Sequence, residues 1–310
     1  MKRTRVILTR PAERQRQLAR WLTDAGYDVL GLPALAIEAL TLSEMRQALQ
    51  AKTWHAQGSD EADVLRWLQQ FNPASFDCVV FVSRAAWQHY WDRFRTQLVG
   101  DSACFRDGKS AVSARPVWPH ATRIACVGRS TAQAIADDLN CPCSDILYPV
   151  GDSTSDSEGL WAVLTDRLHV GQRVLIVRGM TGRPWLAEVM VAAGLEVKSL
   201  PVYRRDRAVW SARQIELLTH VNAADLSSIW VITSAESLRA LQLSLVEHRL
   251  ESLPDLCPEA VLVIHDRLVM PVRRWLSQWG EKAVKIPIDV CQPDDQSLFE
   301  SVQRLATSWL

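Results

Sequence analysis

The sequence predicts an α/β protein of two domains, each built on a parallel sheet with helices on both faces. The chain has 310 residues, more than one core usually organises, and 48% of them are hydrophobic. A strand–helix–strand pattern near the start recurs in the middle of the chain. Strand patterns alternate with helix patterns elsewhere, which is typical of parallel sheets with right-handed crossovers.

The recurring pattern is an internal repeat. Residues 6–33 align without gaps on residues 174–201. Each copy reads as a strand, an amphipathic helix closed by a glycine (Gly26 or Gly194), a second strand, and a proline that leads into an extended exit. Each copy is therefore a βαβ unit.

Two further pairs of segments resemble each other. Val80–Ser83 matches Val231–Ser234, where an apolar strand runs into a hydroxyl residue that can cap the next helix. Residues 124–160 repeat roughly at 261–298. Each half of the protein therefore has the same parts, a βαβ unit and its companion elements.

The order of these parts predicts the domain layout. In one set the βαβ unit precedes its companions, and in the other set it follows them. The simplest arrangement is a discontinuous domain of residues 1–36 and 205–310, with residues 37–204 inserted as a second domain. Two extended crossover strands then join the domains, near residues 33–37 and 201–204. We expect each domain to be flavodoxin-like, with about five strands.

Composition excludes several classes of protein. Lys plus Arg equals Asp plus Glu at 35 each, so the chain lacks the basic surplus of nucleic-acid-binding proteins. The seven cysteines are odd in number and several lie in apolar strand patterns, as in reduced cytoplasmic proteins. Neither a signal peptide nor a membrane span is expected, and the protein is predicted to be a cytoplasmic monomer.

No cofactor or metal is expected. The close pair Cys141 and Cys143 lacks a second cysteine pair or a nearby histidine cluster that would complete a tetrahedral site. The glycine fingerprints of dinucleotide and nucleoside triphosphate sites are absent from the sequence. Histidines are scattered and form no triad pattern.

Four turns follow the carboxyl ends of predicted strands, where parallel sheets bind their ligands. They place small or hydroxyl residues at helix N-termini, whose free N–H groups and positive dipole end receive anions. We expect an acidic small-molecule ligand in a cleft between the domains. The candidate binding residues are Ser83, Arg84, Gly128, Thr131, Arg178, Gly179, Gly182, Arg183, Ser234 and Ala235. When each residue is considered on its own, the alternative is that Ser83, Thr131 and Ser234 only cap helices.

Arg10, Tyr203 and His265 are three further candidates. Arg10 is the repeat mate of Arg178, so it is a candidate for binding an anion, although bracing its own strand end is an alternative. Tyr203 lies on the returning crossover, where its side chain could project towards a ligand or pack against a domain edge. His265 occupies the turn equivalent to Gly128, which makes it a candidate for contact with the ligand. The alternative is that it is a loop histidine exposed to solvent.

The order and spacing of these motifs resemble the uroporphyrinogen-III synthase family from residue 5 to about residue 308. The segments that carry the resemblance are Val6–Pro11, Phe81–Ser83, Ala125–Ala132, Ser157–Leu160, Val174–Arg183, Val202–Arg204 and Thr233-Ser234. The resemblance implies a cofactor-free lyase that converts hydroxymethylbilane to uroporphyrinogen III and water in tetrapyrrole biosynthesis. The resemblance further implies that the last pyrrole ring is inverted through a spiro intermediate.

The resemblance also implies roles for the candidate residues. The substrate is a linear tetrapyrrole with many carboxylates, which suits the anion-receiving turns. Catalysis in the family rests on positioning the substrate. The tyrosine matched by Tyr203 is proposed to assist departure of the hydroxyl group, for which a protonated phenol is a suitable donor at neutral pH.

The chain departs from the family pattern in two places. The turn that usually reads Gly-Pro-x-Thr is His265-Asp266-Arg267-Leu268 here, and the segments at about 50–75 and 99–122 are longer than usual. We expect the second segment to be a mobile surface loop. The altered turn supports an alternative function, a catalytically inactive two-domain binding protein for an acidic small molecule. A response regulator is disfavoured because Arg10-Pro11-Ala12 stands where it would need an acidic cluster.

Overall fold

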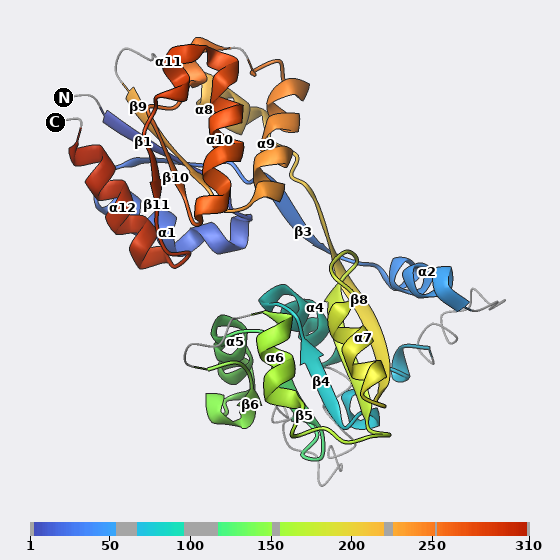
Figure 1. Ribbon diagram of the computed structural model, residues 1–310. Coiled ribbons are helices and arrows are strands. Elements are labelled where there is room, and N and C mark those ends of the chain that lie inside the picture. The colour runs from blue at the N-terminus through green and yellow to red at the C-terminus, as the bar shows by residue number, and fades with distance from the viewer. Residues whose placement is uncertain are drawn as a thin grey trace, which may run out of the picture. The chain divides into compact units, whose positions relative to one another are not determined.

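The chain forms two compact units in a computed structural model that describes residues 3–53, 67–95, 117–150, 156–219, 226–251 and 253–308. Unit 1 comprises Met1–Ile37 and Asp206–Leu310, and unit 2 comprises Glu38–Arg205. Each unit contains one sheet with helices packed against it (Figure 1). Half of the long segment at 50–75, residues 54–66, lies outside the described residues, and so does most of the segment at 99–122 that was predicted to be a mobile surface loop.

Unit 1 has the predicted flavodoxin-like strand order. Its elements are β1 (Arg3–Leu8), α1 (Ala12–Asp24), β2 (Asp28–Gly31), α8 (Ala212–Thr219), β9 (Leu226–Ile232), α9 (Ala235–Glu247), β10 (Ala260–Val263), α10 (Val269–Leu276), α11 (Glu281–Val284), β11 (Ile288–Val290) and α12 (Asp295–Thr307), with the 3₁₀ turns η3 (Pro254–Leu256), η4 (Asp266–Leu268) and η5 (Ser277–Trp279). The strands lie in the order β2-β1-β9-β10-β11, and all four neighbouring pairs are parallel. The described part of unit 1 therefore confirms the predicted fold class.

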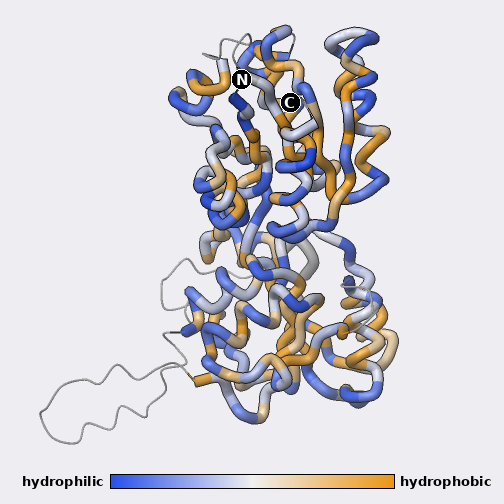
Figure 2. The backbone as a smooth tube through the Cα atoms, turned by 90° about the vertical axis from the view of Figure 1, so that its left-hand side faces the viewer, coloured by the Kyte–Doolittle hydropathy of each residue, from blue (hydrophilic) through white to orange (hydrophobic). Residues whose placement is uncertain are grey.

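Both faces of this sheet are buried, which explains why its strands are continuous apolar runs. In β1, Ile7 packs into one hydrophobic cluster, and its neighbours Val6 and Leu8 pack into another cluster on the opposite face. The helices cover these faces with one apolar side each, and the tube in Figure 2 alternates between hydrophobic and hydrophilic residues along them. No helix of the described residues is long and apolar enough to cross a membrane.

Unit 2 has the same spatial order of equivalent strands, but its βαβ repeat comes last in the chain, whereas that of unit 1 comes first. Its elements are α2 (Leu42–Thr53), η1 (Pro73–Ser75), β4 (Cys78–Phe81), α4 (Arg84–Phe94), β5 (Arg123–Cys126), α5 (Arg129–Leu139), η2 (Cys143–Asp145), β6 (Ile146–Leu147), α6 (Ser157–Leu164), β7 (Arg173–Gly179) and α7 (Trp185–Ala192), followed by β8 (Glu196–Arg207). The strands lie in the order β8-β7-β4-β5-β6, with β3 (Leu35–Ala39) beside β8. The four neighbouring pairs from β8 to β6 are parallel.

The βαβ repeat has the same backbone geometry in both copies. Gly26 ends the turn after α1 with φ +90°, and Gly194 ends the turn after α7 with φ +83°. Residues with a Cβ rarely adopt these angles, so glycine is favoured at both helix ends. The prediction that a glycine closes each repeat helix is confirmed.

The two crossover segments pair with each other as strands β3 and β8. The Leu40 N–H donates to the Val202 carbonyl at 3.0 Å, and the Ala208 N–H donates to the Ala34 carbonyl at 3.0 Å. These bonds have the order expected of antiparallel strands. Arg204 on β8 forms ion pairs with Glu38 on β3 and with Glu44 on α2, which tie the two crossovers together on the unit 2 side.

Two cysteines on adjacent strands are expected to resist chemical labelling in the folded protein. Cys78 on β4 and Cys126 on β5 are fully buried, and burial raises the pKa of both thiols to about 12. Because the thiolate is the reactive form, neither should react with an aromatic disulfide reagent at pH 8, whereas the partly exposed Cys143 should react. Mass spectrometry of labelled peptides measures this difference, with the protein unfolded in urea as the control. Equal labelling rates for Cys78 and Cys143 in the folded protein would contradict the burial.

Candidate functional site

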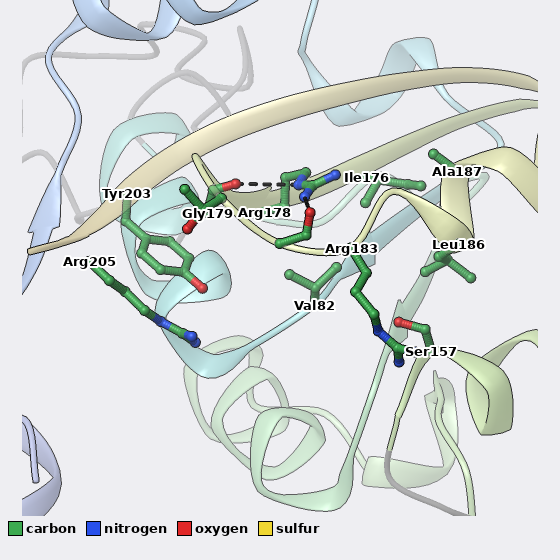
Figure 3. A pocket seen from close by; sticks show the side chains of 12 residues that line it. Val82, Ser157, Ile176, Arg178, Gly179, Arg183, Leu186, Ala187, Tyr203 and Arg205 are labelled. Atoms are coloured by element: carbon green, nitrogen blue, oxygen red, sulfur yellow. Dashed lines mark hydrogen bonds between the residues drawn. The ribbon is translucent and has the colours of Figure 1, made fainter. Parts of the chain in front are cut away.

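A pocket of about 160 Å³ lies in unit 2 at the carboxyl ends of β4 and β7, beside β8 (Figure 3). It is lined by Val82, Ser157, Ile176, Arg178, Gly179, Thr181, Gly182, Arg183, Leu186, Ala187, Tyr203 and Arg205. Parallel sheets bind ligands at this edge. Five of the lining residues, Arg178, Gly179, Gly182, Arg183 and Tyr203, were predicted from the sequence.

Tyr203 is placed in this pocket by an irregularity between β7 and β8. The register of the two strands shifts between Arg178 and Gly179, so that Gly179 lies opposite Tyr203. The Met180 N–H donates to the Tyr203 carbonyl at 2.8 Å and fixes the backbone there. Such irregularities redirect side chains and are frequent near active sites. The side chain of Tyr203 is thereby held at the pocket wall, and the residue is only 4% exposed.

The Tyr203 phenol contacts both neighbouring turns. Its Oη lies 3.1 Å from the Oγ of Ser83, the residue that caps α4. Its ring packs directly over Gly179, because a Cβ built at that glycine would lie 2.9 Å from two ring carbons. The ring of His89 lies 6.0 Å from the phenol ring, centroid to centroid. Tyr203 therefore has a defined position between two turns that were both predicted to bind ligand.

Three guanidinium groups line the pocket, and none of the twelve lining residues is acidic. Arg178 folds over its own turn, donating from Nη2 to the Gly182 carbonyl at 2.7 Å and from Nε to the Gly179 carbonyl at 3.3 Å (Figure 3). Gly182 has φ +142°, a conformation that side chains rarely adopt. The guanidinium of Arg178 thus stabilises the glycine turn in this shape.

Arg183 and Arg205 lie on opposite sides of the pocket. Arg183 donates two hydrogen bonds to Glu158, at 2.8 and 2.9 Å, and these bonds raise the pKa of its guanidinium. The guanidinium carbon of Arg205 lies 5.8 Å from the centre of the Tyr203 ring, within the range of a cation–π contact. The pocket therefore combines a phenol with positive charge, and it suits the carboxylate of a ligand.

Four predicted residues of unit 2 lie near the same sheet edge but are not among the residues that line this pocket: Ser83, which contacts Tyr203 as described above, and Arg84, Gly128 and Thr131. Gly128 caps α5 without a side-chain hydrogen bond, and Thr131 lies in the first turn of that helix, 4% exposed. The hypothesis that Thr131 is itself the cap is wrong, because the cap is Gly128. Arg84 is the exposed first residue of α4.

The predicted residues of unit 1 form a separate group. Ser234 caps α9 by accepting the Ser237 N–H at 2.9 Å, and Ala235 begins that helix. Arg10 is tied internally: its guanidinium forms an ion pair with Asp295 of α12, which matches the bracing alternative. His265 caps η4, and its Nδ1 accepts the Arg267 N–H at 3.1 Å. The altered turn thus retains a side-chain cap.

Arg205 is the charged residue of the pocket lining that sequence reasoning missed. It lies two positions after Tyr203 on β8, and residues two apart on a strand point to the same face. Once Tyr203 was chosen as the crossover residue facing a ligand, this period of two could have identified Arg205. Val82 and Ser157 were also not chosen, although each adjoins or belongs to a motif named above.

Comparison with known proteins gives a family match over most of the chain. The family model described as uroporphyrinogen-III synthase HemD matches residues 16–258. A curated relative, the uroporphyrinogen-III synthase of Salmonella typhimurium, is 30% identical over 137 residues. That match covers 41% of this chain and 51% of the relative, so the chain spans about half the length of the curated relative it matches.

Solved structures with the same name also match. The uroporphyrinogen-III synthetase of Helicobacter pylori has a TM-score of 0.51 at 12% identity, over 97% of this chain and 99% of the other. A mutant uroporphyrinogen III synthase of Thermus thermophilus has a TM-score of 0.48 at 13% identity, over 98% and 99% of the two chains. At such low identity, the Helicobacter match supports the fold alone.

Proposed function

Because the chain belongs to the uroporphyrinogen-III synthase family, we propose that it is a lyase that closes hydroxymethylbilane to uroporphyrinogen III with release of water. The observation that carries this proposal is the buried phenol of Tyr203, held at a pocket whose lining includes three arginines. The reaction needs a proton for the departing hydroxyl and a site that holds an acidic tetrapyrrole in a folded conformation. The pocket supplies candidates for both.

We assign the proton donation to Tyr203. A neutral phenol can donate its proton to the hydroxyl oxygen of the substrate as the carbon–oxygen bond breaks, so that the oxygen leaves as water. The electron-rich pyrrole stabilises the carbon left behind. Ring closure then returns a proton, so no cofactor is consumed.

We assign the carboxylates of the substrate to the arginines and to the backbone N–H groups of the turns. A pocket of about 160 Å³ is too small for a whole tetrapyrrole, since drug-sized ligands occupy about 300 Å³ or more. The pocket therefore takes one part of the substrate. The turns at Gly128 and Ser234, each at the start of a helix, are assigned to other carboxylates.

The function is tested by incubating purified protein with freshly prepared hydroxymethylbilane, oxidising the products and separating the isomers by chromatography. Spontaneous closure gives the type I isomer, so an excess of type III over a protein-free control is the expected result. Boiled protein provides a second control. If the intact, folded protein gives only type I, the proposed activity is wrong.

Removing one cap in unit 1 is expected to have a small effect. Ser234→Ala deletes the side-chain acceptor for the Ser237 N–H but leaves the backbone N–H groups at the start of α9. We expect kcat/KM to fall at most about five- to tenfold, equivalent to roughly 1 kcal/mol. Steady-state formation of type III measures this. A loss beyond a hundredfold in a folded variant would show that the hydroxyl itself, rather than the backbone, binds substrate.

A further inference from the structure

The hydroxyl of Ser83 has two hydrogen-bonding neighbours, and together they restrict the direction of its proton. Its Oγ accepts the Ala86 N–H at 3.1 Å, as the cap of α4. The same atom lies 3.1 Å from Oη of Tyr203, a residue 120 positions later in the chain. The cap bond uses a lone pair of the serine oxygen, so the serine proton remains available for the phenol oxygen.

Donation in that direction is favoured by the helix. A hydroxyl that accepts a hydrogen bond becomes a better donor, and the start of α4 carries the positive end of the helix dipole. If the Ser83 proton lies on the line to Tyr203 Oη, the phenol proton must point elsewhere. The phenol forms part of the pocket wall, so that proton can point into the pocket.

We propose that Ser83 is a positioning residue: its hydroxyl donates to Tyr203 Oη and thereby directs the phenol proton towards the hydroxyl that leaves the substrate. This inference rests on the proposed function for its catalytic consequence. As Tyr203 gives up its proton, negative charge develops on Oη. The Ser83 hydrogen bond then strengthens, because charge-assisted hydrogen bonds are stronger than neutral ones.

The arrangement is not a general property of a capping serine in this fold. Ser234 is the repeat mate of Ser83 and caps its helix in the same way, yet its Oγ pairs with the Oγ of Ser237 at 2.7 Å. The contact with a tyrosine is thus specific to the turn beside the pocket. Gly179 is also required for this contact, because it has no Cβ and so leaves room for the Tyr203 ring beside Ser83.

The test is a double-mutant cycle of Ser83→Ala and Tyr203→Phe, measured as kcat and KM for type III formation. We expect Ser83→Ala to lower kcat roughly tenfold with little change in KM. The double variant should be no slower than Tyr203→Phe alone, because the proton that Ser83 directs is already missing. Ser83→Thr, which keeps the hydroxyl, should restore most of kcat.

The matched control is Ser211→Ala, which removes an exposed serine cap from α8 in unit 1. Its kcat should equal that of the unaltered protein, which separates the loss of a cap from the loss of the tyrosine contact. If the Ser83 and Tyr203 effects on kcat multiply, or if Ser83→Ala changes only KM, the proposal is wrong.

A second readout does not depend on activity. The unaltered protein, Ser83→Ala, Tyr203→Phe and the double variant are unfolded in urea, and the shifts in the midpoint of unfolding are compared. If the two hydroxyls bond to each other, the shift of the double variant is smaller than the sum of the single shifts. Additive shifts would overturn the inference even in an active enzyme. Failure of the proposed function is recognised separately, by the absence of excess type III isomer with the unaltered protein.

Discussion

Replacing Gly179 by alanine is expected to lower kcat about a hundredfold, although it adds only one methyl group. The new Cβ would lie 2.9 Å from two ring carbons of Tyr203 and 3.1 Å from its hydroxyl oxygen. The phenol ring must therefore leave the position in which its Oη lies 3.1 Å from the Oγ of Ser83. A displacement of about 1 Å at a reacting group costs on the order of a hundredfold in rate. Steady-state formation of the type III isomer measures the loss.

The control for Gly179→Ala is Gly31→Ala in unit 1. There the new Cβ would lie 2.9 Å from Oε1 of Gln15, so the steric conflict is equally close but involves none of the residues that line the pocket. Gly31→Ala is expected to shift the thermal midpoint without changing kcat. If both variants retain full kcat, Tyr203 does not need the position seen here, and the assignment of the phenol to proton donation fails.

Tyr203→Phe is expected to lower kcat roughly tenfold to a hundredfold, with KM nearly unchanged. The phenyl ring keeps the packing over Gly179, but the proton for the departing hydroxyl is lost. General acid assistance is typically worth about 10² to 10⁴, and the lower end or less is expected because an electron-rich pyrrole expels the hydroxyl readily. Single-turnover experiments with excess enzyme measure the chemical step directly.

Tyr27→Phe is the matched control for that substitution. Tyr27 lies in unit 1 beside the hydrophobic cluster on one face of its sheet, and its pKa is raised by burial. Removing its hydroxyl should leave turnover unchanged. A Tyr203→Phe protein with unaltered single-turnover rates would leave Tyr203 as a packed crossover residue with no part in the reaction.

The sequence predicted the elements that depend on local periodicity. The βαβ repeat, its two closing glycines and the apolar strands follow from spacing alone, because a parallel sheet buried on both faces requires such runs. The same reasoning located Gly179, Gly182 and Tyr203, since strand ends and crossovers can be read from the chain. The fold class is confirmed for the described residues. The four candidate turns lie, as predicted, at the carboxyl ends of β4, β5, β7 and β9.

Contacts between distant residues could not be predicted in this way. The register shift opposite Tyr203 leaves no pattern in the sequence, since Pro201-Val202-Tyr203 reads as an ordinary extended exit. The pairing of Arg10 with Asp295 joins residues 285 positions apart, and charge alone does not indicate which acid an arginine meets. Arg178 and its repeat mate Arg10 both follow the first strand of a βαβ unit, but their side chains have different partners. Arg178 lines the pocket, whereas Arg10 pairs with Asp295.

The different chain order in the two units has a consequence for synthesis on the ribosome. Unit 2 is one continuous segment and can fold as soon as Arg205 has emerged. In unit 1, β1 is an inner strand whose second neighbour, β9, comes much later; the Thr9 hydroxyl donates to the Val231 carbonyl 222 positions on. At about 5 to 20 residues per second, the apolar β1 waits roughly 10 to 45 s for that partner. A nascent chain therefore carries a half-paired, aggregation-prone strand throughout the production of its other domain.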